Sequence, residues 1–82
     1  MLILKMSIYE FIQLDINSKA DILWSKGVFL ESHFIKEISA KLYYLNDFFV
    51  EVVISNEECE IIEIIPFKQG YRLEKYLNKI KL

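Results

Sequence analysis

Residues 38–65 form three runs of aromatic and branched side chains, and each run is apolar on both of its faces. Short polar segments at 46–47 and 56–58 separate the runs. This alternation is typical of an antiparallel meander of three strands. A sheet with two apolar faces has to be covered on both of them. Because a chain of 82 residues has few other elements for that task, we expect helices on one face and another molecule on the other.

The bulk composition predicts one folded domain over residues 1–82, with 1–5 as an extension of it. The chain is 54% hydrophobic and 15% aromatic, which favours a packed core over disorder. Its net charge of −2 gives no general attraction to nucleic acid or to an anionic membrane. One cysteine excludes an internal disulfide. The sequence shows neither a signal peptide nor an apolar run of about 18 residues, so we expect a cytoplasmic location and no membrane contact.

Helical spacing of apolar residues predicts helices over about 7–14 and 18–26 before the strands begin. Ser18 and Asp21 resemble a capping box, and Gly27 is a stop signal. A first strand over 28–34 precedes the meander, and Pro66 is expected to end the last strand. The stripe of Leu73, Tyr76, Leu77 and Ile80 predicts a closing helix over roughly 71–80. The predicted fold is α+β, with two layers and a four-stranded antiparallel meander in the order α-α-β-β-β-β-α.

Turn lengths predict how the strands pair. A two-residue turn at Asn46-Asp47 places Tyr43 opposite Val50. A three-residue turn at 56–58 places Val53 opposite Ile61 and Glu51 opposite Glu63. One face then carries the apolar residues that we assign to the helices: Tyr43, Leu45, Phe48, Val50, Val52, Ile54, Ile62 and Ile64. A slip of one residue would exchange the two faces.

The opposite face carries the predicted contact residues for a partner protein. It holds the two carboxylates, and we therefore assign it to an interface rather than to the helices. The candidate interface residues are Leu42, Tyr44, Phe49, Glu51, Val53, Ile61, Glu63 and Ile65. If Glu51 and Glu63 are directly opposed, a second interpretation is a carboxylate pair with one raised pKa, suited to acid/base chemistry or to a divalent cation. Structural carboxylates far outnumber catalytic ones, so no catalytic residue is assigned.

Charge is separated along the chain. Basic residues at Lys68, Arg72, Lys75 and Lys79 follow helical spacing and form one ridge, which could contact phosphate groups or an acidic partner. The ordinary interpretation is the solvated face of an amphipathic helix. Glu57, Glu58 and Glu60 crowd the second turn.

Other chemistry is weakly indicated. His33 and Cys59 supply two soft ligands where a zinc site needs about four, and nothing places them together as a nucleophile and base. Gly27 and Gly70 are isolated, so there is no glycine-rich phosphate loop. We assign no metal and no cofactor.

A wider pattern resembles a set of small uncharacterised bacterial proteins of about 75–80 residues. The matching positions cover about residues 7–82, and the pattern is mostly structural, apart from Glu51. They are Leu23, Trp24, Gly27, Leu42, Tyr43, Leu45, Phe48, Val50, Glu51, Val52, 61–67, Leu73, Tyr76 and Leu77. The resemblance implies a compact bacterial domain and brings no activity or functional residue with it.

These observations favour a non-enzymatic interaction protein of the inhibitor, immunity or adaptor kind. It would form a homodimer or dock on a larger protein through an apolar sheet face. The alternative is a small-ligand binding module or enzyme subunit with a pocket between sheet and helices, for which Tyr43, Lys41 and Glu51 are the nearest polar groups. Nucleic-acid binding through the basic ridge ranks third.

Overall fold

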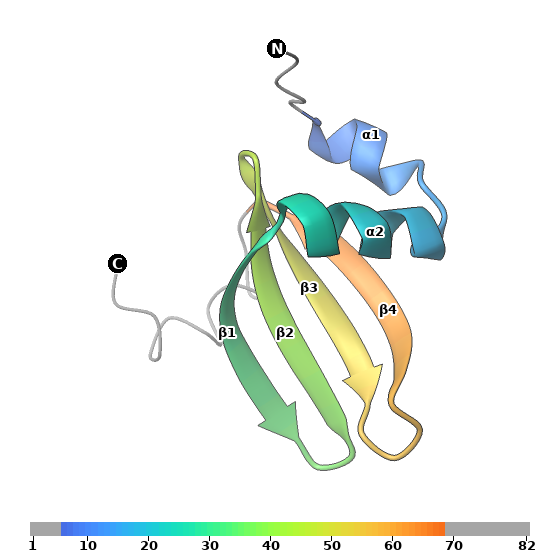
Figure 1. The fold of residues 1–82 in the computed structure, drawn as a ribbon. Helices are drawn as coiled ribbons and strands as arrows, with labels where there is room; N and C mark the ends of the chain where they lie inside the picture. Colours follow the sequence, from blue (N-terminus) through green and yellow to red (C-terminus); the bar gives the residue numbers. More distant parts are fainter. Residues whose placement is uncertain (1–5, 69–82) are drawn as a thin grey trace.

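The computed structural model describes residues 6–68 and has an α+β fold with two helices and a four-stranded sheet. Helices α1 (Ile8–Ile12) and α2 (Ile16–Lys26) come first, followed by β1 (Val28–Ile35), β2 (Ile38–Leu45), β3 (Phe48–Ser55) and β4 (Glu60–Phe67). All neighbouring strands are antiparallel, in the order β1-β2-β3-β4 (Figure 1). The predicted fold class is confirmed for this part of the chain. The predicted helix over 71–80 lies outside the described residues.

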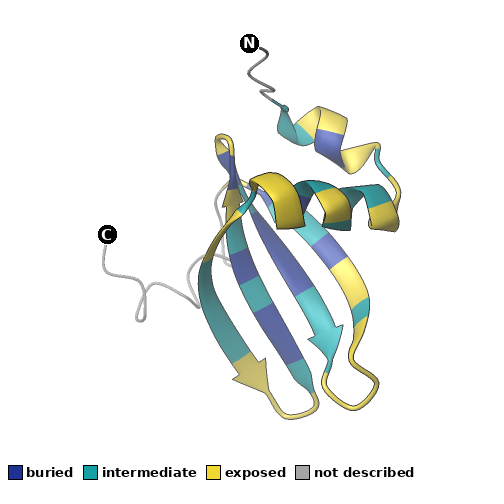
Figure 2. Ribbon diagram, in the orientation of Figure 1, coloured by how far each residue is buried: buried dark blue, intermediate teal, exposed yellow. Residues whose placement is uncertain are grey.

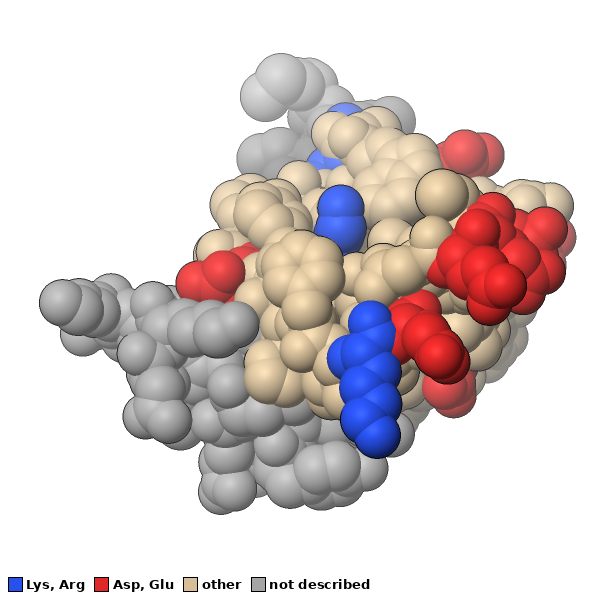
Figure 3. Space-filling model, turned by 90° about the horizontal axis from the view of Figure 1, so that it is seen from below, with Lys and Arg blue, Asp and Glu red and all other residues tan. Residues whose placement is uncertain are grey.

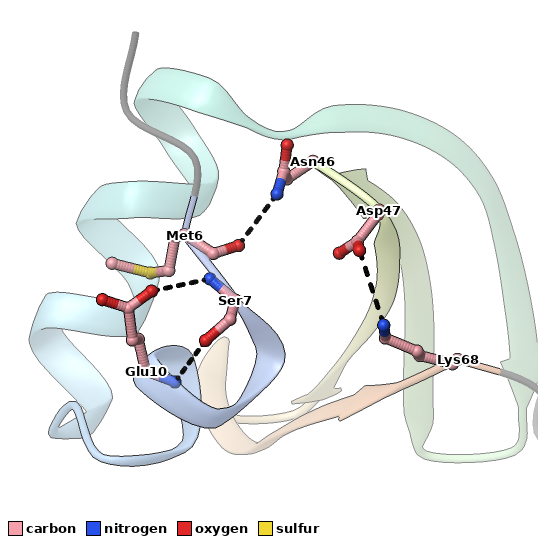
Figure 4. A network of polar contacts seen from close by, with 6 residues as sticks. All are labelled: Met6, Ser7, Glu10, Asn46, Asp47 and Lys68. Carbon is pink, nitrogen blue, oxygen red and sulfur yellow. Dashed lines mark hydrogen bonds and ion pairs between the residues drawn. The ribbon is translucent and has the colours of Figure 1, made fainter. Parts of the chain in front are cut away.

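The two helices begin at side-chain caps that differ from the predicted one. Ser7 and Glu10 form a capping box at α1, in which the Ser7 N–H donates to Glu10 Oε1 at 2.9 Å and the Glu10 N–H donates to Ser7 Oγ at 3.1 Å (Figure 4). Asp15 caps α2 by accepting the Ser18 N–H at 2.8 Å. The predicted box of Ser18 and Asp21 was wrong, because α2 begins at Ile16 and Ser18 already lies inside its first turn.

One face of the sheet packs on the helices, and the predicted assignment of that face is largely confirmed. Phe11 of α1 and Leu23 of α2 are buried against strand residues of this face, which we call the helix face. The buried strand members are Leu45, Phe48, Val50, Val52 and Ile64. Fully burying a side chain of this size stabilises the fold by about 1.5–3 kcal/mol. This cluster therefore fixes which side of each strand points inward.

The β2–β3 pairing follows the predicted two-residue turn at Asn46-Asp47, with Tyr43 opposite Val50. The β3–β4 pairing was predicted wrongly. The connecting turn spans residues 56–59, with Cys59 in a left-handed conformation (φ 57°). This longer turn and the bulge between Val53 and Ile54 together place Glu51 opposite Ile65 instead of Glu63.

The register of β3 and β4 also shifts between Val53 and Ile54, which marks a bulge. The longer turn places Ile61 opposite Ile54 on the helix face, and the bulge restores the predicted sides from Glu63 onward. Ile61 packs toward the helix-face core, whereas Ile62 is exposed. The assignment of Ile61 to the partner face was therefore wrong, and Ile62 does not join the helix-face core to which it was assigned.

Pro66 lies inside β4, opposite Val50, and does not end the strand as predicted. The described sheet places β4 at an edge. An edge strand tolerates proline because one side of its backbone needs no ladder hydrogen bond.

Gly27 connects α2 directly to β1. Glycine is required there because there is no room for a Cβ atom, and not because of the backbone conformation. Its φ of −75° and ψ of 153° suit any residue. A Cβ at this position would lie 2.7 Å from the Leu23 carbonyl oxygen and 3.3 Å from Leu23 Cδ2. Because Leu23 belongs to the buried core, the backbone cannot yield without disturbing that core.

We expect Gly27→Ala to lower the free energy of unfolding by about 1–3 kcal/mol, the usual cost of forcing an extra carbon into a packed site. Urea denaturation followed by Trp24 fluorescence measures this change. The exposed Ser25→Ala variant is the control and is not expected to lower stability. A Gly27→Ala protein as stable as the wild type would contradict the packing argument.

Candidate interaction surface

The face of the sheet opposite the helices, called here the second face, has a buried centre. Ala40, Leu42 and Phe67 form a cluster there, and Leu30 and Phe49 pack against it. The Phe49 and Phe67 rings are stacked, with centroids 5.8 Å apart. This cluster contains Leu42, one of the predicted contact residues, so the centre of the second face belongs to the core and is not a free surface.

The other predicted interface residues differ in exposure. Glu51 is buried like Leu42, with 1% of its surface exposed. Phe49, Val53 and Ile65 are half-buried, and Tyr44 and Glu63 are exposed. The accessible part of the second face therefore lies away from Leu42 and Glu51.

The carboxylate-pair hypothesis loses its geometric basis. Glu51 lies opposite Ile65 on one side and Leu42 on the other, and Glu63 lies opposite Val53. The two glutamates are thus diagonal neighbours on the second face, and Glu51 is buried whereas Glu63 is exposed. Among residues 6–68 there is no group of three or more potential metal ligands.

Exposed apolar side chains gather around β1. They lie at both ends of the strand, on the helix that leads into it and on the neighbouring strand, as the exposed ends of β1 in Figure 2 indicate. We call this set the β1 surface: Trp24, Val28, Phe29, Phe34, Ile35 and Tyr44. Phe34 is 69% exposed and Val28 is 56% exposed. The set consists of two groups, one at each end of β1, separated by the polar residues 31–33. Isolated exposed apolar residues are ordinary, whereas groups of them often mark contact sites.

The arrangement of the two described helices bears on the exposure of this surface. Helices α1 and α2 cross the helix face near the β2–β3 turn, and neither of them reaches its other end (Figure 1). Phe34, opposite Ser39, lies toward that end. Tyr44 lies opposite Val28, so the β1 surface continues onto the second face.

Sequence reasoning missed this surface, although a signal for it existed. Apolar pairs at Val28-Phe29 and Phe34-Ile35 bracket a polar centre at 31–33. A meander places its first strand at an edge, where such pairs have fewer neighbours to cover them.

The two edges of the described sheet differ in chemistry. β4 carries Pro66, the bulge beside Ile62, and the exposed carboxylates of Glu60 and Glu63. Proline, bulges and charges are the features that prevent an edge from pairing with another strand. β1 contains no proline and ends in exposed apolar residues. It does contain a bulge near Leu30, which leaves residues 31–35 as its regular segment.

The predicted basic ridge is described at Lys68 alone. Its Nζ lies 3.4 Å from Asp47 Oδ2, and both side chains are more than half exposed (Figure 4). Such an exposed pair contributes little to stability. Arg72, Lys75 and Lys79 lie outside the described residues, so the ridge and any phosphate contact remain predictions. Acidic side chains cluster at the opposite end of the sheet, where Glu57 and Glu58 occupy the β3–β4 turn (Figure 3).

The polar groups named for a small-ligand pocket do not converge. Tyr43 and Lys41 lie on the helix face, whereas Glu51 lies on the second face. A hollow of about 180 Å³ is lined instead by Met6, Ile22, Lys26, Leu45 and Asn46. The Asn46 amide is already used there, because its Nδ2 donates to the Met6 carbonyl at 3.1 Å (Figure 4). Ligand pockets usually exceed about 300 Å³, so this hollow gives the ligand hypothesis little support.

His33 and Cys59 lie on separate elements, in β1 and in the β3–β4 turn. Cys59 is a free, exposed thiol. The hypothesis of a nucleophile and base gains no support from this placement.

Tyr43 contacts two members of the β1 surface. Its ring centroid lies 5.5 Å from that of Trp24 and 5.6 Å from that of Phe29, both within the range of favourable aromatic contacts. Burial raises the pKa of the Tyr43 phenol above its usual 10.0, because the phenolate would lose hydration. The neutral phenol therefore stabilises the fold fully below pH 10, and this contribution is lost as the pH rises through the folded-state pKa.

We expect the phenolate absorbance of the wild type, minus that of Tyr43→Phe, to give a titration midpoint above pH 10. Trp24→Ala should lower this pKa toward its usual value, because the Tyr43 phenol would be better hydrated. Tyr9→Phe is the control, since Tyr9 is 75% exposed and lies on α1. A difference curve with its midpoint at or below pH 10 would contradict the burial argument.

Comparison with known protein families, with curated proteins and with solved structures found no match. Neither described helix is long and apolar enough to cross a lipid bilayer.

Proposed function

We propose that this chain is a small non-enzymatic protein-interaction module that self-associates or docks on another protein through its sheet. The inhibitor, immunity and adaptor classes all suit this role. The contact region is the β1 surface, together with the adjoining part of the second face around Tyr44. Aromatic residues are enriched in protein interfaces, and this region includes Trp24, Phe29, Phe34 and Tyr44.

The observation that carries the proposal is the clustering of exposed apolar residues. Among residues 6–68, ten large apolar side chains are exposed, and six of them belong to the β1 surface. The other four are spread over α1, the start of α2 and β4. Burying these side chains in a complex would remove apolar area from water. Each Å² of buried apolar area would stabilise the complex by about 25 cal/mol, before the free-energy costs of association are subtracted.

The central part of the second face would support the interface from below without contacting the partner. Leu42 and Glu51 are buried, so a partner would meet Tyr44 and the exposed edge of Phe49 instead. The Tyr44 and Phe49 rings lie 5.3 Å apart and pack edge to face. The buried cluster thus holds Tyr44 in a fixed position, which lowers the entropy lost on binding.

We expect wild-type protein to have the solution mass of two or more chains in concentration-dependent light scattering under reducing conditions. Phe34→Glu should shift the protein to single chains, because it places a charge in the apolar contact. Ile62→Glu is the matched control: Ile62 is 53% exposed on the other edge strand, and its replacement should leave the mass unchanged. A wild type that stays monomeric, or an equal response of the two variants, would contradict self-association through the β1 surface.

A further inference from the structure

We propose that the C-terminal segment of this chain, residues 71–80, docks on the second face of the sheet and covers its centre, on the side opposite α1 and α2. This inference goes beyond the proposed function and does not depend on it. The predicted helix over this segment would form a third layer, instead of joining the other helices on one face as we expected.

The centre of the second face is more deeply buried than the described elements around it explain. Leu42 is 0% exposed and Glu51 is 1% exposed. Both described helices pack on the opposite face (Figure 1), and the side chains that pack against the second-face cluster, Leu30 and Phe49, come from the sheet itself. Strand neighbours cover the sides of a side chain but leave its outer end in water. A further layer over Leu42 and Glu51 accounts for their burial.

The burial also decides between two occupants of this face. Leu42 and Glu51 are buried in a single chain, so their cover comes from the same chain and not from a second copy. The β1 surface differs in this respect, because Phe34 is 69% exposed and Trp24 is 53% exposed. The second face is therefore the docking site for the chain's own segment, and the β1 surface stays available to a partner.

The segment that follows β4 has the length and the apolar pattern for this cover. A helix over 71–80 would be about 15 Å long, and three strand spacings of about 4.8 Å make a four-stranded sheet about 14 Å wide. β4 ends at Phe67, which belongs to the second-face cluster, so residues 68–70 suffice as a short connection. The apolar residues of the segment recur at the spacing of one helical face. They are Leu73, Tyr76, Leu77 and Ile80.

Charge favours the same occupant. The second face carries three carboxylates, at Glu31, Glu51 and Glu63. Basic residues flank the apolar stripe of the segment, at Arg72, Lys75 and Lys79. Opposite charges on two surfaces favour their docking in one orientation. Glu51 already has an interaction in the structure, and docking of the segment requires no group on the second face to be free.

The direct test is a set of nuclear Overhauser contacts in the full-length wild-type protein. The methyl groups of Leu73 and Leu77 should contact Leu42 and its neighbours in the second-face cluster. Isotope filtering in a mixture of labelled and unlabelled chains should place these contacts within one chain. Contacts of Leu73 and Leu77 with Phe11 or Val50 of the helix face, contacts only between chains, or no contact with the sheet would overturn the docking.

Thiol labelling gives a second readout, in a Cys59→Ser background. The Ala40→Cys variant reports on the second face, and the Val50→Cys variant reports on the helix face. Adding Leu77→Asp should speed labelling of the Ala40→Cys variant by at least about tenfold, because the charge displaces the segment, and should leave the Val50→Cys variant slow. Asn78→Asp is the matched control, since it adds the same charge outside the apolar stripe and should change neither rate. Equal acceleration of both variants, or of neither, would overturn a cover confined to the second face.

Failure of this inference is distinguishable from failure of the proposed function. A monomeric wild type in which Leu77 contacts Leu42 contradicts self-association alone. An oligomer without that contact contradicts the docking alone. The Phe34→Glu variant should keep the contact, because Phe34 belongs to the β1 surface and not to the second-face cluster.

Discussion

The packing of Phe11 and Leu23 against the helix face is the contact on which the rest of the structure depends. Both side chains are almost completely buried, and they press against Phe48, Val50 and Val52 from the central part of the sheet. Because strand side chains alternate, this one contact decides the direction of every other residue in β2 and β3. The remaining apolar residues must then lie on the second face or at the edges, where the helices do not reach.

This constraint explains which parts of the fold the sequence could predict. The pairing of β2 with β3 follows from the two-residue turn at Asn46-Asp47, and Asn46 accepts the left-handed conformation found there (φ 58°). The two faces could then be read from the alternation of Tyr43, Leu45, Phe48 and Val50. Local rules were sufficient because neither strand carries a bulge in this pairing.

The errors arose where tertiary context overrides local rules. Cysteine is not a residue that marks a left-handed turn position, so the extra length of the β3–β4 turn at Cys59 had no signal. That extra residue moved Ile61 to the helix face, and the bulge beside Ile62 restored the predicted sides from Glu63 onward. Pro66 was wrongly predicted to end the last strand, because proline is tolerated within a strand that lies at the edge of a sheet. The β1 surface was missed for the same reason: the exposure of an edge strand depends on where the helices end, and local sequence rules do not predict that.

The interaction hypothesis rests on the exposed apolar residues of the β1 surface, and the contrast between the two edges of the described sheet supports it. A partner strand or a second copy would find a proline, a bulge and carboxylates at β4, but exposed apolar ends and a polar centre at β1. The second face, first considered as the contact region, supplies a rigid buried support around Leu42. The function proposed for the chain thus follows from the uneven cover that a short helical layer gives to a sheet with two apolar faces.

The central claim is that the β1 surface is the contact region, and the fluorescence emission of Trp24, the one tryptophan in the sequence, at two protein concentrations tests it most directly. The account predicts emission at a shorter wavelength in concentrated protein, because contact removes water from the exposed indole ring, and a return to a longer wavelength on dilution. An emission maximum that is the same at both concentrations would contradict it.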